Sequence, residues 1–412
     1  MGEFRRMPML RPRSCAGAML LAALSAPVLA DEGDRLPGGF EPILHLRTYY
    51  FDQESTSGAP STAWALGGWA GLRSPWWGDI LQLEIVGYTS QKLYGPEGKG
   101  GTRILTADQG SITTLGEANA ALRFAGQTFT AWRQLINRPF INPNDSRMIP
   151  HTFEAYLLSG DVGPVSYTGG YVTKVKLRDT DDFRWMSDVA GGDGPHRGVA
   201  MAGGNYKFGK GGLLRVDEQY TFDVFNSFYA DLRYPLELAD KTTLVLAAQG
   251  YPQKSVGDRQ IGAFSTWGYG LQAALGRGPF GAQLYWTQTG KGRDTLNPYG
   301  VHPSYLNLMQ VAFNSAGEKA WGLGGDVDFG PFGAPGLKAS AIHASGTDRF
   351  DFSTGAPIGD RNETNVQLAY AFAKGSMLEG LTGALRYSWL HQDGAAQTGQ
   401  QLRLYFNYDV RF

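Results

Sequence analysis

Apolar and polar residues alternate along much of the chain, and the pattern is clearest in the last twelve residues, QLRLYFNYDVRF (401–412). Apolar or aromatic side chains occupy every second position from Leu402 to Phe412, and the positions between them are mostly polar or charged. A period of two residues is typical of a β-strand whose two faces meet different surroundings. The segment therefore predicts a strand with one apolar and one polar face.

Eight short turns rich in glycine, proline and polar residues divide the chain after residue 30 into nine blocks. Glycine accepts positive φ angles and proline presets φ, so each turn segment is suited to a tight reversal of the chain. Each block consists of a strand-like segment, a polar loop and a second strand-like segment, which predicts nine hairpins and 18 strands. The turns are RSPWWGD (73–79), FAGQT (124–128), GDVGP (160–164), FGKGG (208–212), PLELADK (235–241), GRGPF (276–280), GPFGAPG (330–336) and KGSMLEG (374–380).

The connections are sorted by length, with short turns at one end of the hairpins and longer loops at the other. Bacterial outer-membrane barrels show this asymmetry together with an even strand number. A half-buried strand in a soluble sheet would explain the alternation but not the sorting. We therefore predict an all-β fold: a transmembrane antiparallel β-barrel of 18 strands, with short periplasmic turns, long external loops and both termini in the periplasm.

The composition fits a barrel in which alternation dilutes the apolar residues. The chain has 57 glycines, 13% aromatic residues and a mean hydropathy of −0.27, and no segment after residue 30 approaches a transmembrane helix. In a barrel, the apolar positions from Leu402 to Phe412 would face hydrocarbon. A terminal aromatic residue also resembles the C-terminal signature that the barrel-assembly machinery recognises, so Phe412 is expected to be needed for assembly.

The first thirty residues predict a secretory signal peptide. Arginines precede a short apolar run over 16–26, and small residues follow up to Ala30, where cleavage is expected. The single cysteine, Cys15, lies before the apolar run, so a lipoprotein signal is not expected and the mature chain, 31–412, would contain no cysteine. The true start could be Met1, Met7 or Met9. Only about a dozen residues separate Ala30 from the first strand, so no plug domain or TonB box is expected and transport should be passive.

Two long segments resemble the OprD-type family of substrate-specific outer-membrane porins. They are QLINRPFINPNDSRMIPHTFEAYLLSG (134–160) and NPYGVHPSYLNLMQVAFNSAGEKAWGLGGDVDFG (297–330). The resemblance implies an 18-stranded pore whose third and seventh loops, about 136–150 and 291–318 here, fold inward. It also implies passive, selective diffusion of small carboxylate-bearing solutes such as amino acids, small peptides or aromatic acids along a row of lumenal arginines. It does not identify the solute or decide between a monomer and a homotrimer.

Successive side chains of a strand point to opposite faces, and this alternation, which we call strand parity, predicts which arginines face the lumen. If Leu46 faces lipid, Arg47 faces inward, and if Trp132 faces lipid, Arg133 faces inward. Arginine stays charged and binds carboxylates through paired hydrogen bonds, so a row of weak sites could pass a solute along. Some of these arginines could instead merely neutralise lumenal carboxylates such as Asp231. The resemblance supports Arg47, Arg133, Arg386 and Arg403 as members of the row, and parity alone adds Arg233 and Arg411.

The two inserted loops supply the remaining candidate solute-binding residues, Asp145, Tyr299, Ser304 and Tyr305. The stretch Asn-Asp-Ser-Arg (144–147) has a second interpretation, in which Asp145 or Arg147 anchors the loop to the barrel wall. We favour anchoring for Arg147, because a loop folded into a pore needs partners for its buried polar backbone.

Two other classes of protein fit the composition less well. An outer-membrane enzyme of the phospholipase or protease type would need a catalytic constellation, but the six histidines are scattered and no Gly-x-Ser-x-Gly or His-Glu-x-x-His motif occurs. A secreted glycan-binding β-protein is suggested only by the ten tryptophans. The sequence predicts no enzyme, no cofactor and no metal, and the net charge of −1 gives no indication of nucleic-acid binding.

Overall fold

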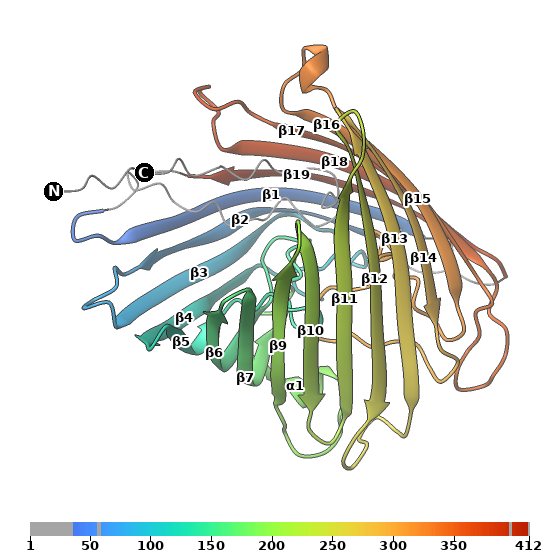
Figure 1. Cartoon of the computed structure of the whole chain (residues 1–412), viewed down its shortest axis with the longest axis horizontal. Helices are drawn as coiled ribbons and strands as arrows, with labels where there is room; N and C mark the ends of the chain where they lie inside the picture. The colour runs from blue at the N-terminus through green and yellow to red at the C-terminus, as the bar shows by residue number, and fades with distance from the viewer. Residues whose placement is uncertain (1–35, 56–58, 395–397, 411–412) are drawn as a thin grey trace.

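The computed structural model describes residues 36–55, 59–394 and 398–410, which form one closed β-barrel (Figure 1). The predicted signal peptide and the residues Arg411 and Phe412 lie outside the described residues. Every strand pairs antiparallel with its neighbours. The first and last strands close the barrel through pairs that run from His45 with Asp409 to Ser55 with Gly399.

Eighteen long strands build the wall within the described ranges. The first nine are β1 (Glu41–Ser55), β2 (Ser61–Arg73), β3 (Leu81–Tyr94), β4 (Ile112–Phe124), β5 (Gln127–Gln134), β6 (Thr152–Val162), β7 (Val165–Lys176), β9 (Val199–Phe208) and β10 (Gly212–Thr221). The others are β11 (Phe225–Glu237), β12 (Thr242–Ser255), β13 (Ser265–Arg277), β14 (Phe280–Thr289), β15 (Lys319–Asp328), β16 (Leu337–Thr347), β17 (Arg361–Ala371), β18 (Leu381–Gln392) and β19 (Gly399–Asp409). Between β7 and β9, a loop contains the two-residue strand β8 (Arg184–Trp185) and the short helix α1 (Met186–Val189).

The predicted count of 18 strands is confirmed, and each predicted turn joins the expected pair of strands. The turns gather at one end of the barrel, which we call the short-turn end, and include one 3-10 turn, η1 (Gly330–Phe332). The opposite end, which we call the loop end, carries the longer connections. The described chain begins and ends at the short-turn end, because β1 starts there and β19 finishes beside it.

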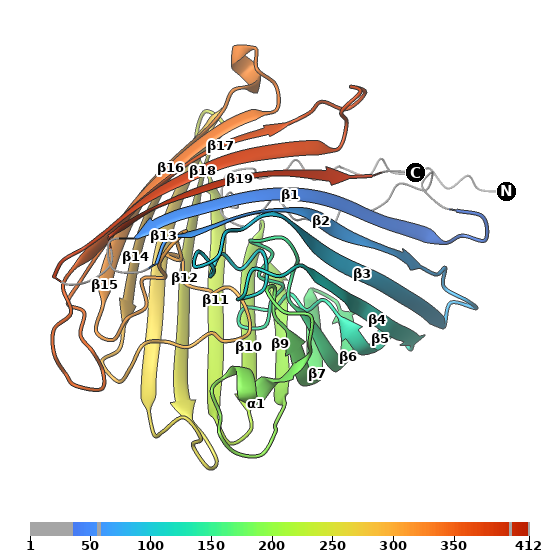
Figure 2. The same ribbon diagram turned by 180° about the vertical axis from the view of Figure 1, so that it is seen from behind.

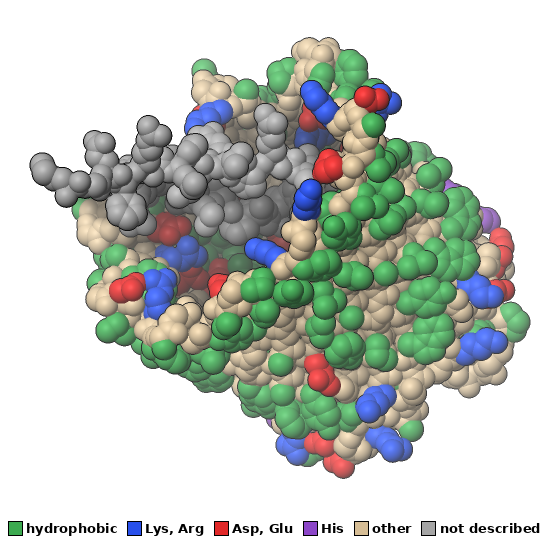
Figure 3. Space-filling model, viewed as in Figure 1, with side chains coloured by type: hydrophobic (Ala, Val, Ile, Leu, Met, Phe, Trp, Pro, Cys, Tyr) green, Lys and Arg blue, Asp and Glu red, His purple; other side chains and the backbone are tan. Residues whose placement is uncertain are grey.

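Apolar side chains cover the outer surface, as the alternation predicts. In β1, Leu46 is 45% exposed whereas Arg47 beside it is 6% exposed, and in β18 Leu385 is 43% exposed whereas Ala384 beside it is 3% exposed. Figure 3 shows a broad band of hydrophobic side chains over the outside of the wall, with charged side chains mainly towards the two ends. This is the surface expected of a barrel that sits in lipid.

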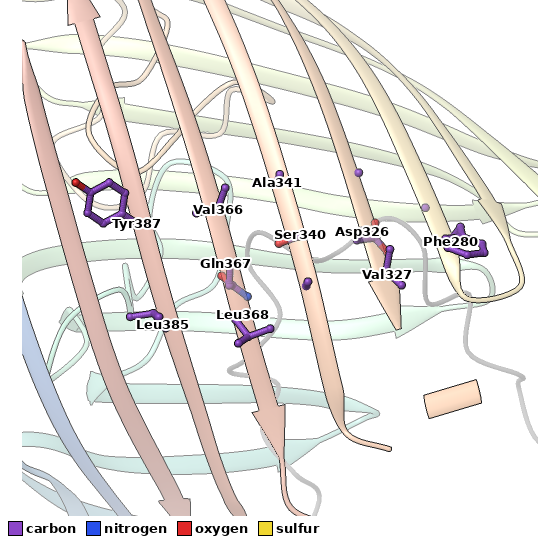
Figure 4. Close-up of a pocket in the computed structure, with 13 residues that line it drawn as sticks. Phe280, Asp326, Val327, Ser340, Ala341, Val366, Gln367, Leu368, Leu385 and Tyr387 are labelled. Carbon is purple, nitrogen blue, oxygen red and sulfur yellow. The ribbon is translucent and has the colours of Figure 1, made fainter. Parts of the chain in front are cut away.

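Small residues create an apolar groove of about 640 Å³ on the outer surface across β14 to β18 (Figure 4). Gly325, Ala339 and Ala341 line its middle, and Phe280 and Leu385 lie at its two sides. It faces the surroundings of the barrel, so we assign no solute to it.

Several loops fold into the barrel (Figure 1 and Figure 2). The main apolar clusters form where these loops pack against the wall. Ile136 and Ile141, from the loop 135–151, pack with Phe153 of β6 and with Tyr299 from the loop 290–318. The loop 95–111 also folds inward, through residues such as Ile104. The loop between β7 and β9 contributes Met186, which packs in the same cluster as Ile136. Among the described residues, four loops therefore narrow the lumen, of which the sequence predicted two.

Candidate functional site

Arg47 of β1 anchors the loop 135–151 to the wall. Its guanidinium donates to both carboxylate oxygens of Asp145, at 2.5 and 3.2 Å, and to the backbone oxygen of Arg147 at 2.5 Å. Its Nε donates to Asn407 Oδ1 of β19 at 2.5 Å. Arg138 adds a second anchor by donating to Asp217 of β10 at 2.5 Å. Asp145 is thus an anchoring residue of this loop.

Arg147 and Arg178 hold the same loop from the loop end. Arg147 donates to the backbone oxygens of Thr102 and Ser146, both at 2.9 Å, so these hydrogen bonds join the loop 135–151 to the loop 95–111 and not to the barrel wall. Arg178 donates to the side chains of Asn144 and Ser146. Burial and the nearby Arg178 lower the pKa of Arg147 to about 9, and burial and neighbouring arginines lower the pKa of Arg178 to about 10. Both remain charged near neutral pH.

The tip of the loop 290–318 is held by one buried carboxylate and one buried arginine. Glu363 of β17 accepts hydrogen bonds from the backbone N–H groups of Gln310 (3.0 Å) and Val311 (2.9 Å). Arg403 of β19 donates to the backbone oxygen of Met309 at 2.6 Å. These contacts satisfy backbone groups that the folded-in loop removes from water.

The base of the loop 290–318 is held by a buried ion pair. Arg361 of β17 donates to both carboxylate oxygens of Glu318, at 2.8 and 2.6 Å, and Glu318 also accepts from the backbone N–H of Ser315 at 2.9 Å. Arg349 lies 3.8 Å from the same carboxylate.

The two inserted loops are also joined to each other. The amide of Asn142 accepts from the backbone N–H of Val301 at 2.7 Å and donates to the backbone oxygen of Val301 at 2.9 Å. A displacement of one loop would therefore also displace the other. Together the two loops form the constriction of the lumen.

His302, within the loop 290–318, predicts a sensitivity to acid. It bonds Thr295 at 2.9 Å, and burial lowers its pKa to about 3 from an ordinary value of 6.5. The folded loop favours the neutral His302 ring, so the neutral ring stabilises the folded position of the loop. This contribution is complete above about pH 6.5, and it declines by about 1.4 kcal/mol per pH unit as the pH falls towards 3. Open-channel current noise should therefore rise between pH 7.5 and 5. The variant His302→Gln should show a smaller rise, and an equal rise in both proteins would contradict the assignment.

Arg386 and Arg403 face each other across neighbouring strands, β18 and β19. Beside them, Tyr49 and Tyr405 stack with ring centres 5.1 Å apart. Arg403 bonds Met309 and Gln401, but Arg386 makes no hydrogen bond or ion pair to the described part of the chain, and its buried Nε has no partner. Like charges placed directly opposite each other in a sheet are unfavourable, so this pair favours a bound anion.

Arg233 lies in a second lumenal cluster. It donates to Asp231 at 2.8 Å, and Tyr305 of the loop 290–318 donates to the same carboxylate at 2.7 Å. The Arg233 guanidinium also lies 5.6 Å from the centre of the Tyr305 ring. Burial and the nearby Asp231 raise the pKa of Tyr305, so its hydroxyl stays protonated as a donor. Arg233 is thus already partly neutralised by Asp231.

Tyr299 and Ser304 are buried supports of the loop 290–318. Tyr299 is fully buried, packs in an apolar cluster and forms a hydrogen bond with Thr221 at 3.1 Å. Ser304 is 6% exposed. The Ser304 hydroxyl accepts a hydrogen bond from the backbone N–H of Leu306 at 3.4 Å, so both side chains make contacts within the protein.

The structure corrects the expected position of Arg133. It pairs in register with Glu154, and the two side chains form an ion pair at 3.2 Å. Phe153 and Ala155, on either side of Glu154, are fully buried and pack in the cluster that contains the inserted loops. Glu154 and Arg133 therefore lie on the side of the sheet away from those loops, apart from the other predicted arginines.

Several residues of the constriction were not predicted from the sequence. The parity of β17 could have found Glu363, because Val366 and Leu368 are on the outward face. No comparable signal marks the loop residues Arg103 and Arg178 or the anchor Glu318, because loops have no regular period.

The described residues contain no group of histidine, cysteine and acidic side chains placed to hold a metal ion. Within the same ranges, no helix has the length and apolar character needed to cross a membrane.

The fold and the narrowed lumen define a β-barrel channel. The profile of the family described as outer membrane porin, OprD family, matches residues 39–412. The chain belongs to this family, so it is an outer-membrane porin and not an enzyme, and the bacterial outer membrane is its location.

Individual relatives agree with the family assignment. The chain is 22% identical over 398 residues to Porin D of Pseudomonas aeruginosa. This alignment covers 89% of the present chain and 90% of Porin D. The crystal structure of OccK9 (OpdG) from P. aeruginosa superposes with a TM-score of 0.82 at 20% identity, covering 90% of this chain and 98% of the other. OpdK from the same organism, crystallised with vanillate, gives a TM-score of 0.78 at 20% identity, covering 90% and 99% of the two chains.

Proposed function

We propose that this porin passes small carboxylate-bearing solutes by passive, selective diffusion, and that Arg386 makes the main contact with the carboxylate. The observation that carries the proposal is the cross-strand pair of Arg386 and Arg403. Arg386 has no protein acceptor among the described residues, although it lies in a lumen wall built from hydrogen-bonded side chains. A carboxylate would accept hydrogen bonds from it and relieve the repulsion within the pair.

The surroundings of Arg386 suit transit rather than tight binding. Tyr49 and Tyr405 stack on each other beside the guanidinium groups and add no competing charge, and the proposed row continues with Arg233, which is already partly neutralised by Asp231. Several weak sites in sequence let a solute enter and leave. OpdK, a similar barrel, was crystallised with vanillate, which is an aromatic carboxylate.

The other predicted site residues divide by their contacts. We assign Arg47, Asp145, Tyr299 and Ser304 to holding the loops, with Arg403 serving both a loop and the solute. Tyr305 joins its loop to Asp231 and presents its ring to Arg233. Arg411 lies outside the described residues and stays a candidate.

We further infer the orientation and the partners of the barrel. The short-turn end, where the described chain begins and ends, would face the periplasm, which places the narrowing loops towards the outside. Phe412 would be read by the barrel-assembly machinery. Assembly as a homotrimer is compatible with the broad apolar outer surface but is not required by the proposed mechanism.

The variant Arg386→Gln tests the proposal, because Arg386 makes no contact that holds either loop. Uptake of a small carboxylate such as benzoate into proteoliposomes should fall roughly fivefold, as expected for the loss of about 1 kcal/mol of ion pairing, and selectivity in planar bilayers should shift towards cations. Arg277→Gln provides a matched control, since Arg277 is an exposed arginine near the short-turn end. Unchanged uptake and selectivity in Arg386→Gln would overturn the proposal.

A further inference from the structure

Three arginines from three different loops gather at the loop end of the constriction. Arg103 belongs to the loop 95–111, Arg147 to the loop 135–151 and Arg178 to the loop 177–198. The backbone oxygen of Thr102, the neighbour of Arg103, accepts a hydrogen bond from Arg147 at 2.9 Å, and Arg147 and Arg178 both bond Ser146. Repulsion among the three contributes to the lowered pKa of Arg147 and of Arg178. Strand parity could not have nominated these residues.

The loop arginines lie next to the wall arginines. The guanidinium of Arg147 is 4.9 Å from the centre of the Phe51 ring, and that of Arg403 is 5.8 Å from the same centre. A second link runs through Ser146, which bonds Arg147 and Arg178 and also accepts from the hydroxyl of Tyr49 at 3.3 Å. The two sets of arginines are thus separated by little more than one side chain.

No ion pair within the described residues neutralises this charge, although Glu363 lies near Arg403 and Asp179 lies near Arg178. Arg103, Arg147, Arg178, Arg386 and Arg403 form no ion pair with any residue that the structure describes. Of the carboxylates near them, Asp145 is bound by Arg47 on both oxygens, and Glu363 is used by two backbone N–H groups. Arg103 is exposed and makes no hydrogen bond within the described ranges. A single carboxylate would neutralise only one of the five positive charges.

We propose that Arg103, Arg147 and Arg178 form a second carboxylate site, and that the preferred solutes of this channel are small dicarboxylates. One carboxylate would contact Arg386 and Arg403 on the wall while the other contacts the loop arginines, chiefly Arg103. The inference rests on the proposed function, because it uses the same wall site. A solute that meets both sites gains from both at once, whereas a monocarboxylate can occupy only one of them at a time.

Succinate and butyrate make a suitable pair of probes, because both have four carbon atoms and only succinate has a second carboxylate. The full mature protein in planar bilayers at pH 7.5 gives, for each probe, the concentration that half-blocks the single-channel current. We expect succinate to block at a concentration roughly fivefold lower than butyrate, the ratio that one additional exposed ion pair would give. Equal blocking concentrations would overturn the inference.

The variant Arg103→Asn isolates the loop site, and asparagine tolerates the positive φ of 57° at this position. It should abolish most of the preference for succinate, by weakening the block by succinate more than the block by butyrate, whereas Arg103→Lys should retain most of the preference. Arg386→Gln should weaken the block by both probes. If Arg386→Gln weakens both while Arg103→Asn changes neither, the second site is refuted and the proposed function stands. If Arg386→Gln changes neither probe, the proposed function itself fails.

Discussion

Replacing Arg47 with methionine is expected to release the loop 135–151 and widen the channel. The Arg47 and Asp145 side chains are only 7% and 11% exposed, so their ion pair lies almost out of water. Removing the arginine leaves the Asp145 carboxylate buried without a counter-ion, and it also removes the hydrogen bond to the backbone oxygen of Arg147. Breaking one side of a buried pair costs about 3–5 kcal/mol. The loop 135–151 should therefore detach from the barrel wall, because this returns the Asp145 carboxylate to water.

Single-channel conductance measures this release directly. Arg47→Met should show a larger conductance and weaker discrimination between solutes than the unchanged protein. The double variant Arg47→Met with Asp145→Leu should recover much of the original conductance, because no unpaired charge then remains to drive the loop out. If the single variant keeps the original conductance, the loop is held by its apolar contacts and not by this ion pair.

The barrel could be predicted because its signals are local in the sequence. Alternation identifies the two faces of a strand from a few consecutive residues, and glycine and proline mark the turns between strands. The same rule gave the inward position of Arg47 and of Arg403, and of Asp231 in β11, all of which are buried.

The error at Arg133 shows where local parity stops being sufficient. Trp132 adopts a positive φ of 83° and is exposed, so it does not follow the regular alternation of β5. The face on which Arg133 lies is set by its register partner Glu154, and strand register is a relation between segments that one segment does not encode. A single irregular residue was enough to reverse the prediction.

The anchors of the loops could not be predicted, because they join residues far apart in the chain. Asp145 meets Arg47 from 98 positions away, and the backbone of Gln310 meets Glu363 from 53 positions away. Which arginine binds a loop and which stays open to a solute depends on these pairings. Strand alternation and the family resemblance therefore predicted a row of lumenal arginines, and only the structure separates the arginines that anchor loops from Arg386.

Changing Glu318 to glutamine is expected to detach the base of the loop 290–318. The Glu318 side chain is fully buried, and it is the ion-pair partner of Arg361 and lies 3.8 Å from Arg349. Glutamine keeps the shape but removes the charge, so two buried guanidinium groups lose their counter-ion at a cost of about 3–5 kcal/mol. The temperature at which the folded, heat-modifiable form is lost on gels should fall, and open-channel noise should rise.

Lys319, the next residue, provides the control for this prediction. Its ion pair with Asp348 is exposed, with side chains 45% and 59% accessible, so Lys319→Gln should change stability by no more than about 1 kcal/mol. Combining Glu318→Leu with Arg361→Met removes the main buried pair as a unit and should restore part of the stability. If Glu318→Gln behaves like Lys319→Gln, the buried ion pair does not hold the loop. The hydrogen bonds between Asn142 and Val301 and the contacts of Glu363, Arg403 and Tyr305 would then hold the loop 290–318 in place.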